Sequence, residues 1–307
     1  MGKIAFIFPG QGAQYIGMGK DIADKYNEAN DIFNEASDSL GFDIKKMMFE
    51  GSEEALKITE NTQPAILTTS IACMQPLLKR GINPDVTAGL SIGEYSAFVL
   101  AGAFSFADVV KLVKKRGKYM QEAVPIGVGT MAAIIGLSTH AVVDACNEAS
   151  GIVEPANFNC PGQIVIAGEI GAVERAVEIC KTKGAKKAII LQVSAPFHCS
   201  MLKSAGEKLA SEFKNIEVND ISIPVVSNVT AQYITNKNLV KELLIKQVSN
   251  PVLWEDSVRV MLNDGVDTFV EIGPGKALTG FVRRISKDAK VFNIENIDSL
   301  ESYIKGE

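Results

Sequence analysis

The sequence predicts an α/β protein with a parallel sheet and a smaller unit inserted into the chain. One observation is the run Gly-x-Ser-x-Gly at residues 89–93, which lies between a short apolar run and an Ala-rich helical run. Another is the apolar N-terminal run, which is followed by Pro9 and Gly10 and indicates a first strand. Short strands followed by helices are typical of parallel sheets. A third observation is the segment 129–195, where the pattern changes and indicates the insert.

Length and composition agree with one large domain that carries a smaller one. The chain has 307 residues, of which 47% are hydrophobic, enough for a sizeable core. The net charge of −5 does not indicate a nucleic-acid-binding protein, which would carry an excess of positive charge. No run approaches the ~18 apolar residues of a membrane span, and the short N-terminal run lacks a signal-peptide cleavage site. The number of cysteines is odd, and they are scattered without the spacing of metal ligands, which predicts reduced thiols in a cytoplasm and no metal site. They are Cys73, Cys146, Cys160, Cys180 and Cys199.

The first part of the chain predicts one strand followed by helices. The apolar run at 1–8 is expected to form the first strand. Thr62-Gln63-Pro64 then predicts the start of an apolar helix that ends before Gly81, because polar residues and proline favour a first helical turn. The predicted helices of this part are 20–37, 52–60, 62–78 and, after the Ser91 helix, 105–122.

The loop after the first strand reads Phe-Pro-Gly-Gln-Gly-Ala-Gln at 8–14. Two glycines leave the amide of Gln11 exposed at the end of a strand, where α/β proteins place ligand-contacting loops. An amide at such a place can donate to an oxyanion. The alternative is a plain turn; a phosphate-binding P-loop is rejected because the run lacks a Lys-Ser/Thr ending.

The run at 89–93 predicts a nucleophile elbow, which is a sharp turn from a strand into a helix. Gly89 and Gly93 have no Cβ, so two backbones can approach closely. Ser91 is then expected in a strained conformation with its hydroxyl in the open, at a helix N-terminus that favours a developing negative charge. The alternative is a Gly/Ser turn without chemistry, but the required strand before and helix after are present.

The helix predicted at 105–122 carries a charge on its apolar face. Arg116 follows Val113 by three residues, so both side chains share the inward face. A buried guanidinium needs a partner, which is either a carboxylate of the protein or a substrate carboxylate held by two hydrogen bonds. The lysines of this helix fall largely on the outer side: Lys111, Lys114, Lys115 and Lys118.

The insert is predicted to span 127–195, so that 1–126 and 196–307 form a discontinuous larger domain. Pro125, Gly127 and Gly129 mark its entry, and Ala195-Pro196 marks its exit. Its pattern of strand, helix, strand, strand, helix, strand predicts the ferredoxin-like arrangement. The predicted strands are 130–136, 152–158, 163–168 and 187–193, and the predicted helices are 138–149 and 171–183.

Two histidines are candidates for a catalytic base. His198 lies at the exit of the insert, before a helix and downstream of Ser91, the order found in α/β-hydrolases. Clefts at domain junctions favour sites, so His198 is the predicted base on an α/β-hydrolase-like core. His140 begins a polar helix in the insert and is expected to be structural. Cys199 has no elbow around it and is expected to be a small buried residue.

The last part of the chain predicts strands at 223–227 and 268–272 and helices around 238–248 and 255–263. Glu-Ile-Gly-Pro-Gly at 271–275 then precedes a helix that runs to 286. The Gly-Pro-Gly turn is interpreted as packing, with a phosphate-proximal loop as the alternative.

Taken together, these motifs resemble those of the bacterial malonyl-CoA:acyl carrier protein transacylase family over nearly the whole chain. No single run is specific, but the set is. The matching runs are 8–14, Gly-Leu-Ser-Ile-Gly-Glu-Tyr-Ser-Ala at 89–97, Lys-Arg-Gly with Met-Gln around 115–121, Ala-Asn-x-Asn-x-Pro-Gly-Gln at 156–163, Pro-Phe-His at 196–198, Gln-Val-Ser-Asn-Pro-Val-Leu-Trp at 247–254 and 271–275.

The resemblance implies the catalytic roles. Ser91 would be the acylated nucleophile, and His198 would be its general base. A backbone carbonyl at Gln247 would orient the histidine, so no triad carboxylate is expected. Gln11 and the backbone N–H of Ile92 would form the oxyanion hole.

The resemblance also implies the substrate-binding residues. Arg116 would hold the malonyl carboxylate, with Asn157 in a matching run nearby. Phe197 before the histidine resembles the malonyl-selecting form of the motif. Leu90 departs from the histidine that the family often has before the nucleophile, so any auxiliary role of that histidine is absent.

The reaction implied is ping-pong transfer from malonyl-CoA to the phosphopantetheine thiol of an acyl carrier protein, with no cofactor beyond these substrates. We expect a monomer without a nucleic-acid or membrane partner, and a role in fatty-acid synthesis. The alternatives are a serine esterase or thioesterase, a polyketide-pathway acyltransferase, and a non-enzymatic carrier-docking module. Carrier proteins are acidic, so docking is expected at a basic patch, formed by the four lysines above or by Arg283, Arg284 and Lys287.

Overall fold

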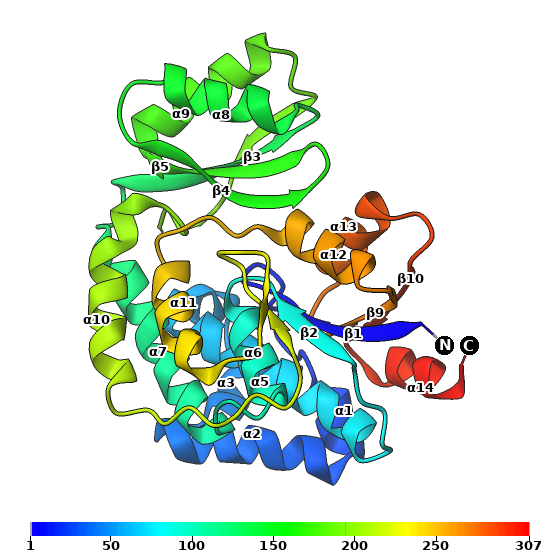
Figure 1. Ribbon diagram of the computed structural model, residues 1–307. Coiled ribbons are helices and arrows are strands. Elements are labelled where there is room, and N and C mark those ends of the chain that lie inside the picture. Colours follow the sequence, from blue (N-terminus) through cyan, green and yellow to red (C-terminus); the bar gives the residue numbers. More distant parts are fainter. Residues whose placement is uncertain (1, 194, 307) are drawn as a thin grey trace.

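The computed structural model describes residues 2–193 and 195–306. Met1, at the start of the predicted first strand, Ser194, near the end of the predicted insert, and Glu307 lie outside them. Figure 1 shows a larger unit around one sheet and a smaller unit stacked on it, with the two chain ends close together beside β1. Within the described residues no helix is long and apolar enough to cross a membrane.

The larger sheet has six strands in the order β10-β9-β1-β2-β7-β8. All neighbouring strands in it run parallel except β7 and β8, which are antiparallel. Its strands are β1 (Lys3–Phe8), β2 (Val86–Gly89), β7 (Val225–Val226), β8 (Tyr233–Ile234), β9 (Val266–Ile272) and β10 (Lys290–Ile294).

Helices cover both faces of this sheet. Phe6 packs into a core that includes α5 (Thr59–Leu78), while Ile7 packs into a second core with α12 (Trp254–Asn263) and α13 (Ala277–Ile285). A parallel strand buried on both faces has a continuous apolar sequence, which explains the unbroken N-terminal run. The other helices of the larger unit are α1 (Lys20–Lys25), α2 (Asn27–Leu40), α3 (Ile44–Glu50), α4 (Glu53–Lys57), α6 (Ile92–Leu100), α7 (Phe106–Ala123), α10 (Lys203–Phe213), α11 (Val240–Gln247) and α14 (Ile297–Lys305).

The predicted helix at 20–37 is wrong in one respect, because extended backbone at Tyr26 divides it into α1 and α2. The apolar helix begins at Thr59, earlier than the predicted Thr62, so Pro64 lies inside it. The elements α3, β8, β10 and α14 have no predicted counterpart. The prediction of a mixed α/β protein with a parallel-rich sheet is confirmed.

The smaller unit has a separate antiparallel sheet in the order β4-β5-β3-β6. Two helices cover its outer face (Figure 1) and share their own apolar core with it. The order of elements agrees with the prediction, although β6 ends at Ile190, before the predicted 193. The elements are β3 (Gly129–Ile135), α8 (Thr139–Glu148), β4 (Val153–Cys160), β5 (Gln163–Glu169), α9 (Ile170–Thr182) and β6 (Lys187–Ile190).

Candidate active site

Ser91 occupies a strained turn between β2 and α6. Its φ of 55° and ψ of −109° lie outside the regions that most residues adopt. A Cβ at Gly89 would lie 2.0 Å from the carbonyl carbon of Gly93, and a Cβ at Gly93 would lie 2.2 Å from the carbonyl oxygen of Phe8. Both positions therefore require glycine, and the predicted geometry of the turn is confirmed. The expectation that Ser91 stands in the open is wrong, since the residue is only 8% exposed and lies within a cleft.

Asn228, in the segment after β7, stabilises this turn through two hydrogen bonds. Its Oδ1 accepts a hydrogen bond from the backbone N–H of Ser91 at 2.7 Å, and its Nδ2 donates to the carbonyl of Gly89 at 2.7 Å. The side chain is completely buried. A strained turn has no regular backbone partners, so this amide satisfies groups that would otherwise be buried without a hydrogen bond. No local pattern in the sequence indicated Asn228.

His198 faces Ser91 from the loop after the smaller unit. Its Nε2 lies 2.7 Å from Ser91 Oγ, and its Nδ1 lies 2.8 Å from the main-chain oxygen of Gln247. A carbonyl oxygen only accepts hydrogen bonds, so the proton of the neutral ring is on Nδ1 and Nε2 accepts from the hydroxyl. The residue also has a positive φ of 61°. Two strained residues therefore meet at this hydrogen bond.

The surroundings of His198 keep its ring neutral. Burial, and then the nearby Arg116 guanidinium, lower the pKa of His198 to about 4, while its hydrogen bond to Gln247 opposes this shift. At neutral pH the ring is therefore unprotonated, and Nε2 is able to take a proton.

Arg116 lies on the inward face of α7, as the sequence predicted, and is only 1% exposed. Its Nη1 donates to Gln63 Oε1 at 2.8 Å. Its Nη2 donates to Gln247 Oε1 at 2.9 Å and to Ser91 Oγ at 3.2 Å. The Nε has no partner among the described residues, and no carboxylate of those residues lies within 4.0 Å of the guanidinium. The hydrogen-bond partners of this buried cation are thus neutral, while the buried carboxyl group of Glu94 acts on it only from a longer range.

Gln247, the last residue of α11, contacts Ser91, His198 and Arg116. In addition to its contacts with His198 and Arg116, its Nε2 donates to the carbonyl of Ser91 at 2.9 Å and to Glu94 Oε2 at 2.6 Å. Burial raises the pKa of Glu94 to about 8, and the hydrogen bond from Gln247 opposes this. The resemblance implied only the backbone carbonyl of Gln247, so its side-chain contacts and the presence of Glu94 are new.

Gln11 and Ile92 carry the two donors that the resemblance assigned to the oxyanion hole. Gln11 follows β1 and lines the same cleft as Ser91 and His198. Its Nε2 makes a long contact of 3.4 Å to Thr59 Oγ1. Ile92 is the first residue of α6, and N–H groups of a first helical turn have no acceptor within the helix. The Gln11 amide thus lies in the cleft of Ser91, and the N–H of Ile92 directly follows Ser91 in the chain.

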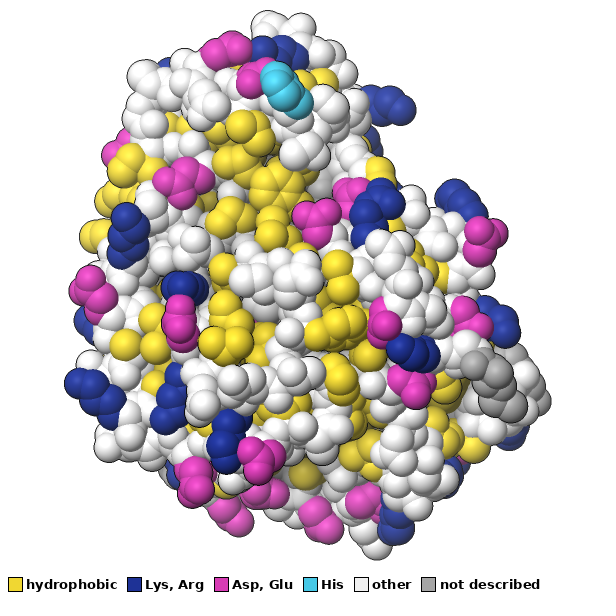
Figure 2. Space-filling view, viewed as in Figure 1, with side chains coloured by type: hydrophobic (Ala, Val, Ile, Leu, Met, Phe, Trp, Pro, Cys, Tyr) yellow, Lys and Arg dark blue, Asp and Glu magenta, His cyan; other side chains and the backbone are white. Residues whose placement is uncertain are grey.

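The cleft has a volume of about 1010 Å³ and is lined by both units. Met131 and Val165 of the smaller unit lie in its wall. The residues that the resemblance assigned to substrate binding also line it, namely Leu90, Asn157 and Phe197. Figure 2 shows hydrophobic side chains gathered in the middle of one face of the molecule, with charges of both signs scattered around them.

The other candidates lie elsewhere in the molecule. His140 is on α8 with its side chain 88% exposed and paired with Asp144. Cys199 is buried, its Sγ donates to the carbonyl of Pro196 at 3.1 Å, and burial raises the pKa of its thiol to about 12, which disfavours a thiolate nucleophile. Among residues 2–193 and 195–306 no group of three or more His, Cys, Asp or Glu could hold a metal ion.

The turn at 273–275 packs against the core. A Cβ at Gly273 would lie 2.3 Å from Ser70 Oγ. The buried carboxylate of Glu271 accepts from the backbone N–H groups of Leu278 and Thr279 at the start of α13. Gly273 is thus closely packed and the carboxyl group of Glu271 occupies this helix N-terminus, while Gly275 lines the cleft. The phosphate-proximal loop stays the alternative.

Comparison with known proteins agrees with this geometry. The acyl transferase domain family matches residues 5–306. The chain belongs to the acyl transferase family. A relative in Bacillus subtilis (strain 168), called malonyl CoA-acyl carrier protein transacylase, is 47% identical over 99% of this chain and 97% of its own length. The resemblance found in the sequence is thereby confirmed.

Solved structures of acyl transferases extend the agreement to the fold. The malonyl CoA-acyl carrier protein transacylase of Clostridium perfringens is 48% identical, with a TM-score of 0.96 over 99% of this chain and 96% of that one. A malonyl-transacylase solved in complex with a type II polyketide synthase acyl-carrier protein is 42% identical, with a TM-score of 0.97 over 99% of this chain and 100% of that one. The mixed α/β architecture with a separate antiparallel sheet is therefore shared with this family.

Proposed function

We propose that the chain transfers the malonyl group of malonyl-CoA to the phosphopantetheine thiol of an acyl carrier protein, through a malonyl ester on Ser91. The names of the relatives support this, and so does one observation above all. The guanidinium of Arg116 lies beside the Ser91–His198 pair in a buried site, without a carboxylate partner among the described residues. A substrate with a free carboxylate would complete such a site.

In the first half-reaction, Ser91 Oγ attacks the thioester carbonyl carbon while His198 Nε2 takes the hydroxyl proton. The negative oxygen of the tetrahedral intermediate receives hydrogen bonds from the N–H of Ile92 and from the amide of Gln11, which gives up its long contact with Thr59. The C–S bond then breaks, and the proton passes from His198 to the sulfur of CoA.

In the second half-reaction, the carrier thiol gives its proton to His198 and its sulfur attacks the ester carbonyl. The C–O bond to Ser91 breaks, and the proton returns to Ser91 Oγ. Throughout both steps Arg116 binds the malonyl carboxylate, and Phe197, Leu90 and Asn157 shape the space around the acyl group. Protons and electrons balance, so these residues need no cofactor.

The architecture suits this role. We interpret the larger unit, 1–126 and 196–307, as an α/β-hydrolase-like domain, because a strained serine follows a central parallel strand. We interpret 127–195 as a ferredoxin-like insert, supported by its element order and its antiparallel sheet. A cytoplasmic location is proposed on the five cysteines, all of them buried free thiols. We propose that the chain acts as a monomer.

Fatty-acid synthesis is the proposed pathway, and the structure with a polyketide carrier favours a second candidate, a polyketide pathway. The test is a transfer assay with malonyl-CoA in which the mass of the carrier protein is measured. A carrier protein from each pathway is offered separately, together with a control that contains only water. Malonylation of a fatty-acid carrier supports the proposal, preference for a polyketide carrier supports the second candidate, and release of free malonate in the water control identifies a thioesterase.

A further inference from the structure

Glu94 is a buried carboxyl group that the mechanism above does not use. It follows Ser91 by three residues in the first turn of α6 and is completely buried. Its Oε2 accepts from Gln247 Nε2 at 2.6 Å and from the backbone N–H of Asn228 at 3.4 Å. Its Oε1 has no hydrogen-bond partner, and Glu94 forms no ion pair within the described part of the chain. Burial raises the pKa of Glu94, and its hydrogen bonds and the nearby Arg116 guanidinium offset this shift only in part. Since a buried carboxyl group without an ion pair is costly, a role for Glu94 has to be sought in what it binds.

Glu94 binds the side-chain amide of Gln247, whose two ends have opposite hydrogen-bonding character. The NH₂ end faces two acceptors, Glu94 Oε2 and the carbonyl of Ser91. The oxygen end faces Nη2 of Arg116, which only donates. A flip of this amide would turn its NH₂ group toward the guanidinium and its oxygen toward two other oxygens. All three contacts therefore oppose the flip, and the contact with Glu94 is the shortest of them.

We infer that Glu94 is a positioning residue that fixes the amide orientation of Gln247, and through it holds the Arg116 guanidinium beside Ser91. The inference rests on the proposed function, because the position of Arg116 changes the preference for malonyl over acetyl groups only if Arg116 receives the substrate carboxylate. The path from Glu94 to the acyl group therefore runs through two residues, and Glu94 itself does not touch the substrate.

This role does not depend on a negative charge. Burial raises the pKa of Glu94 to about 8, so the neutral form is accessible near neutral pH. A carboxyl group protonated on Oε1 still offers Oε2 to Gln247. The side chain of glutamine offers the same acceptor in nearly the same shape, whereas methionine fills a similar volume without an oxygen. The variants E94Q and E94M thus form a matched pair that differs in the acceptor.

The test compares malonyl-CoA with acetyl-CoA, which has no carboxylate for Arg116, in wild type and both variants. The readout is the ratio of kcat/KM for the two acyl groups, with thermal unfolding as a check on folding. In E94M the malonyl-to-acetyl ratio should fall about tenfold or more, as expected when a buried hydrogen bond in a charged network is lost. In E94Q the ratio should stay within about threefold of wild type. Should E94M not fold, E94A also lacks the acceptor and should show the same fall.

The possible outcomes separate the hypotheses. A folded E94M with the wild-type ratio, or with equal losses for both acyl groups, would overturn the inference and leave Glu94 a structural residue. An equal fall in E94Q and E94M would also overturn it, because charge and not the acceptor would then matter. In a Q247L background E94M should change the ratio no further, since Glu94 acts only through Gln247. A wild-type protein that forms no malonyl ester would instead refute the proposed function.

Discussion

The main-chain carbonyl oxygen of Gln247 lies 2.8 Å from Nδ1 of His198. The proposed base is therefore oriented by a neutral acceptor, where many serine hydrolases use a carboxylate. A carboxylate would stabilise the protonated ring and raise its pKa, but a carbonyl does so much less. The low pKa of His198, about 4, agrees with this arrangement because burial and Arg116 are not offset by a negative charge at the ring.

This relationship predicts the pH dependence of the acylation step. Only the neutral ring takes a proton from Ser91, so activity is lost as pH falls through the pKa of His198 in the folded protein. The rate of acylation by malonyl-CoA should stay flat from about pH 8 to about pH 5 and fall with a midpoint near 4, well below the 6.5 of an ordinary histidine. Rapid-quench measurements, with circular dichroism to verify folding at each pH, provide the check. A midpoint near 6.5 would contradict the assigned environment.

Replacement of Arg116 should change the substrate preference. R116A removes one partner of a desolvated pair, a loss that typically costs ~3–5 kcal/mol, or roughly a hundred- to several-thousand-fold in malonyl transfer. Acetyl transfer should be spared or improved, because acetyl-CoA has no carboxylate to leave unpaired. R116K should recover only part of the malonyl activity, since an ammonium group cannot form two parallel hydrogen bonds. Equal losses for both acyl groups in R116A would make Arg116 a structural residue.

Replacement of Asn228 should weaken the turn that holds Ser91. N228A leaves the N–H of Ser91 and the carbonyl of Gly89 buried without partners, so the free energy of unfolding should fall by about 2 kcal/mol or more. Urea unfolding measures this loss. N83A is the matched control because Asn83 is exposed and its Nδ2 donates to the nearby carbonyl of Gly81, so its effect should stay within about 0.5 kcal/mol. Equal stability of N228A and wild type would show that the hydrogen bonds of Asn228 do not stabilise the turn.

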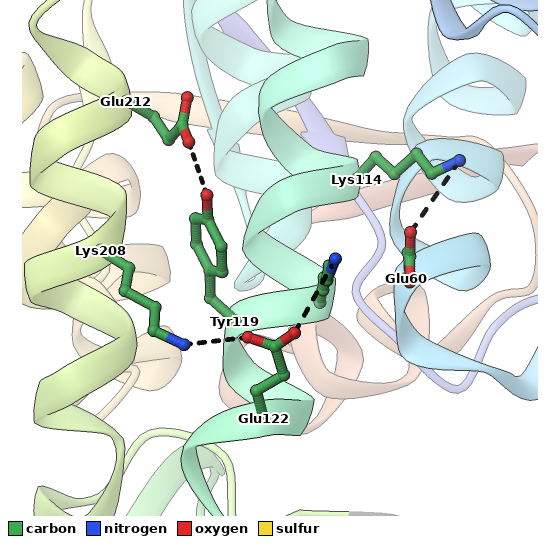
Figure 3. A network of polar contacts seen from close by, with 7 residues as sticks. Glu60, Lys114, Tyr119, Glu122, Lys208 and Glu212 are labelled. Carbon is green, nitrogen blue, oxygen red and sulfur yellow. Dashed lines mark hydrogen bonds and ion pairs between the residues drawn. The ribbon is translucent and has the colours of Figure 1, made fainter.

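The structure changes the expectation about carrier docking. Each of the four lysines on α7 has a carboxylate within 4.0 Å, so that its charge is offset. Figure 3 shows the contact of Lys114 with Glu60 and, between α7 and α10, a network in which Glu212 accepts from Tyr119 and Glu122 contacts Lys208. The network ties the helix of Arg116 to a neighbouring helix. The second candidate patch, Arg283, Arg284 and Lys287, lies at the end of α13, a helix whose first turns line the cleft.

Charge reversal distinguishes the two patches. R283E/K287E should raise the KM for the carrier protein, most strongly at low salt, with little effect on the constants for malonyl-CoA. K111E/K118E is the control on α7 and should have the smaller effect. A larger, salt-sensitive defect in the control would place docking on α7 after all.

The sequence was informative where chemistry depends on local spacing. Gly89, Ser91 and Gly93 predict the strained turn because its steric demand acts within five residues. The inward face of Arg116 follows from helical periodicity alone. The partners of these groups were not predictable in the same way, since Asn228 meets Ser91 across 137 positions and Gln247 meets Glu94 across 153. Such pairs are set by tertiary packing, which no local pattern encodes.

The predicted elements that were wrong or missing also lacked a clear local signal. The break between α1 and α2 occurs at Tyr26, a residue with no strong preference against a helix. β8 has only two residues, and β10 is a five-residue edge strand, so neither gives a clear periodic signal. The exposure expected for Ser91 was wrong because the smaller unit and Phe197 help to enclose the cleft.

The central claim is that Ser91 carries the malonyl group between the two thiols. The most direct test is the intact mass of the protein after it is mixed with malonyl-CoA and then with a holo acyl carrier protein, in wild type, S91A and H198A. Wild type should gain one malonyl group, mapped to Ser91, and lose it rapidly to the carrier but only slowly to water. H198A should form this ester several orders of magnitude more slowly, and S91A should not form it. A malonyl adduct on S91A, or a wild-type ester that water discharges as fast as the carrier does, would contradict the account.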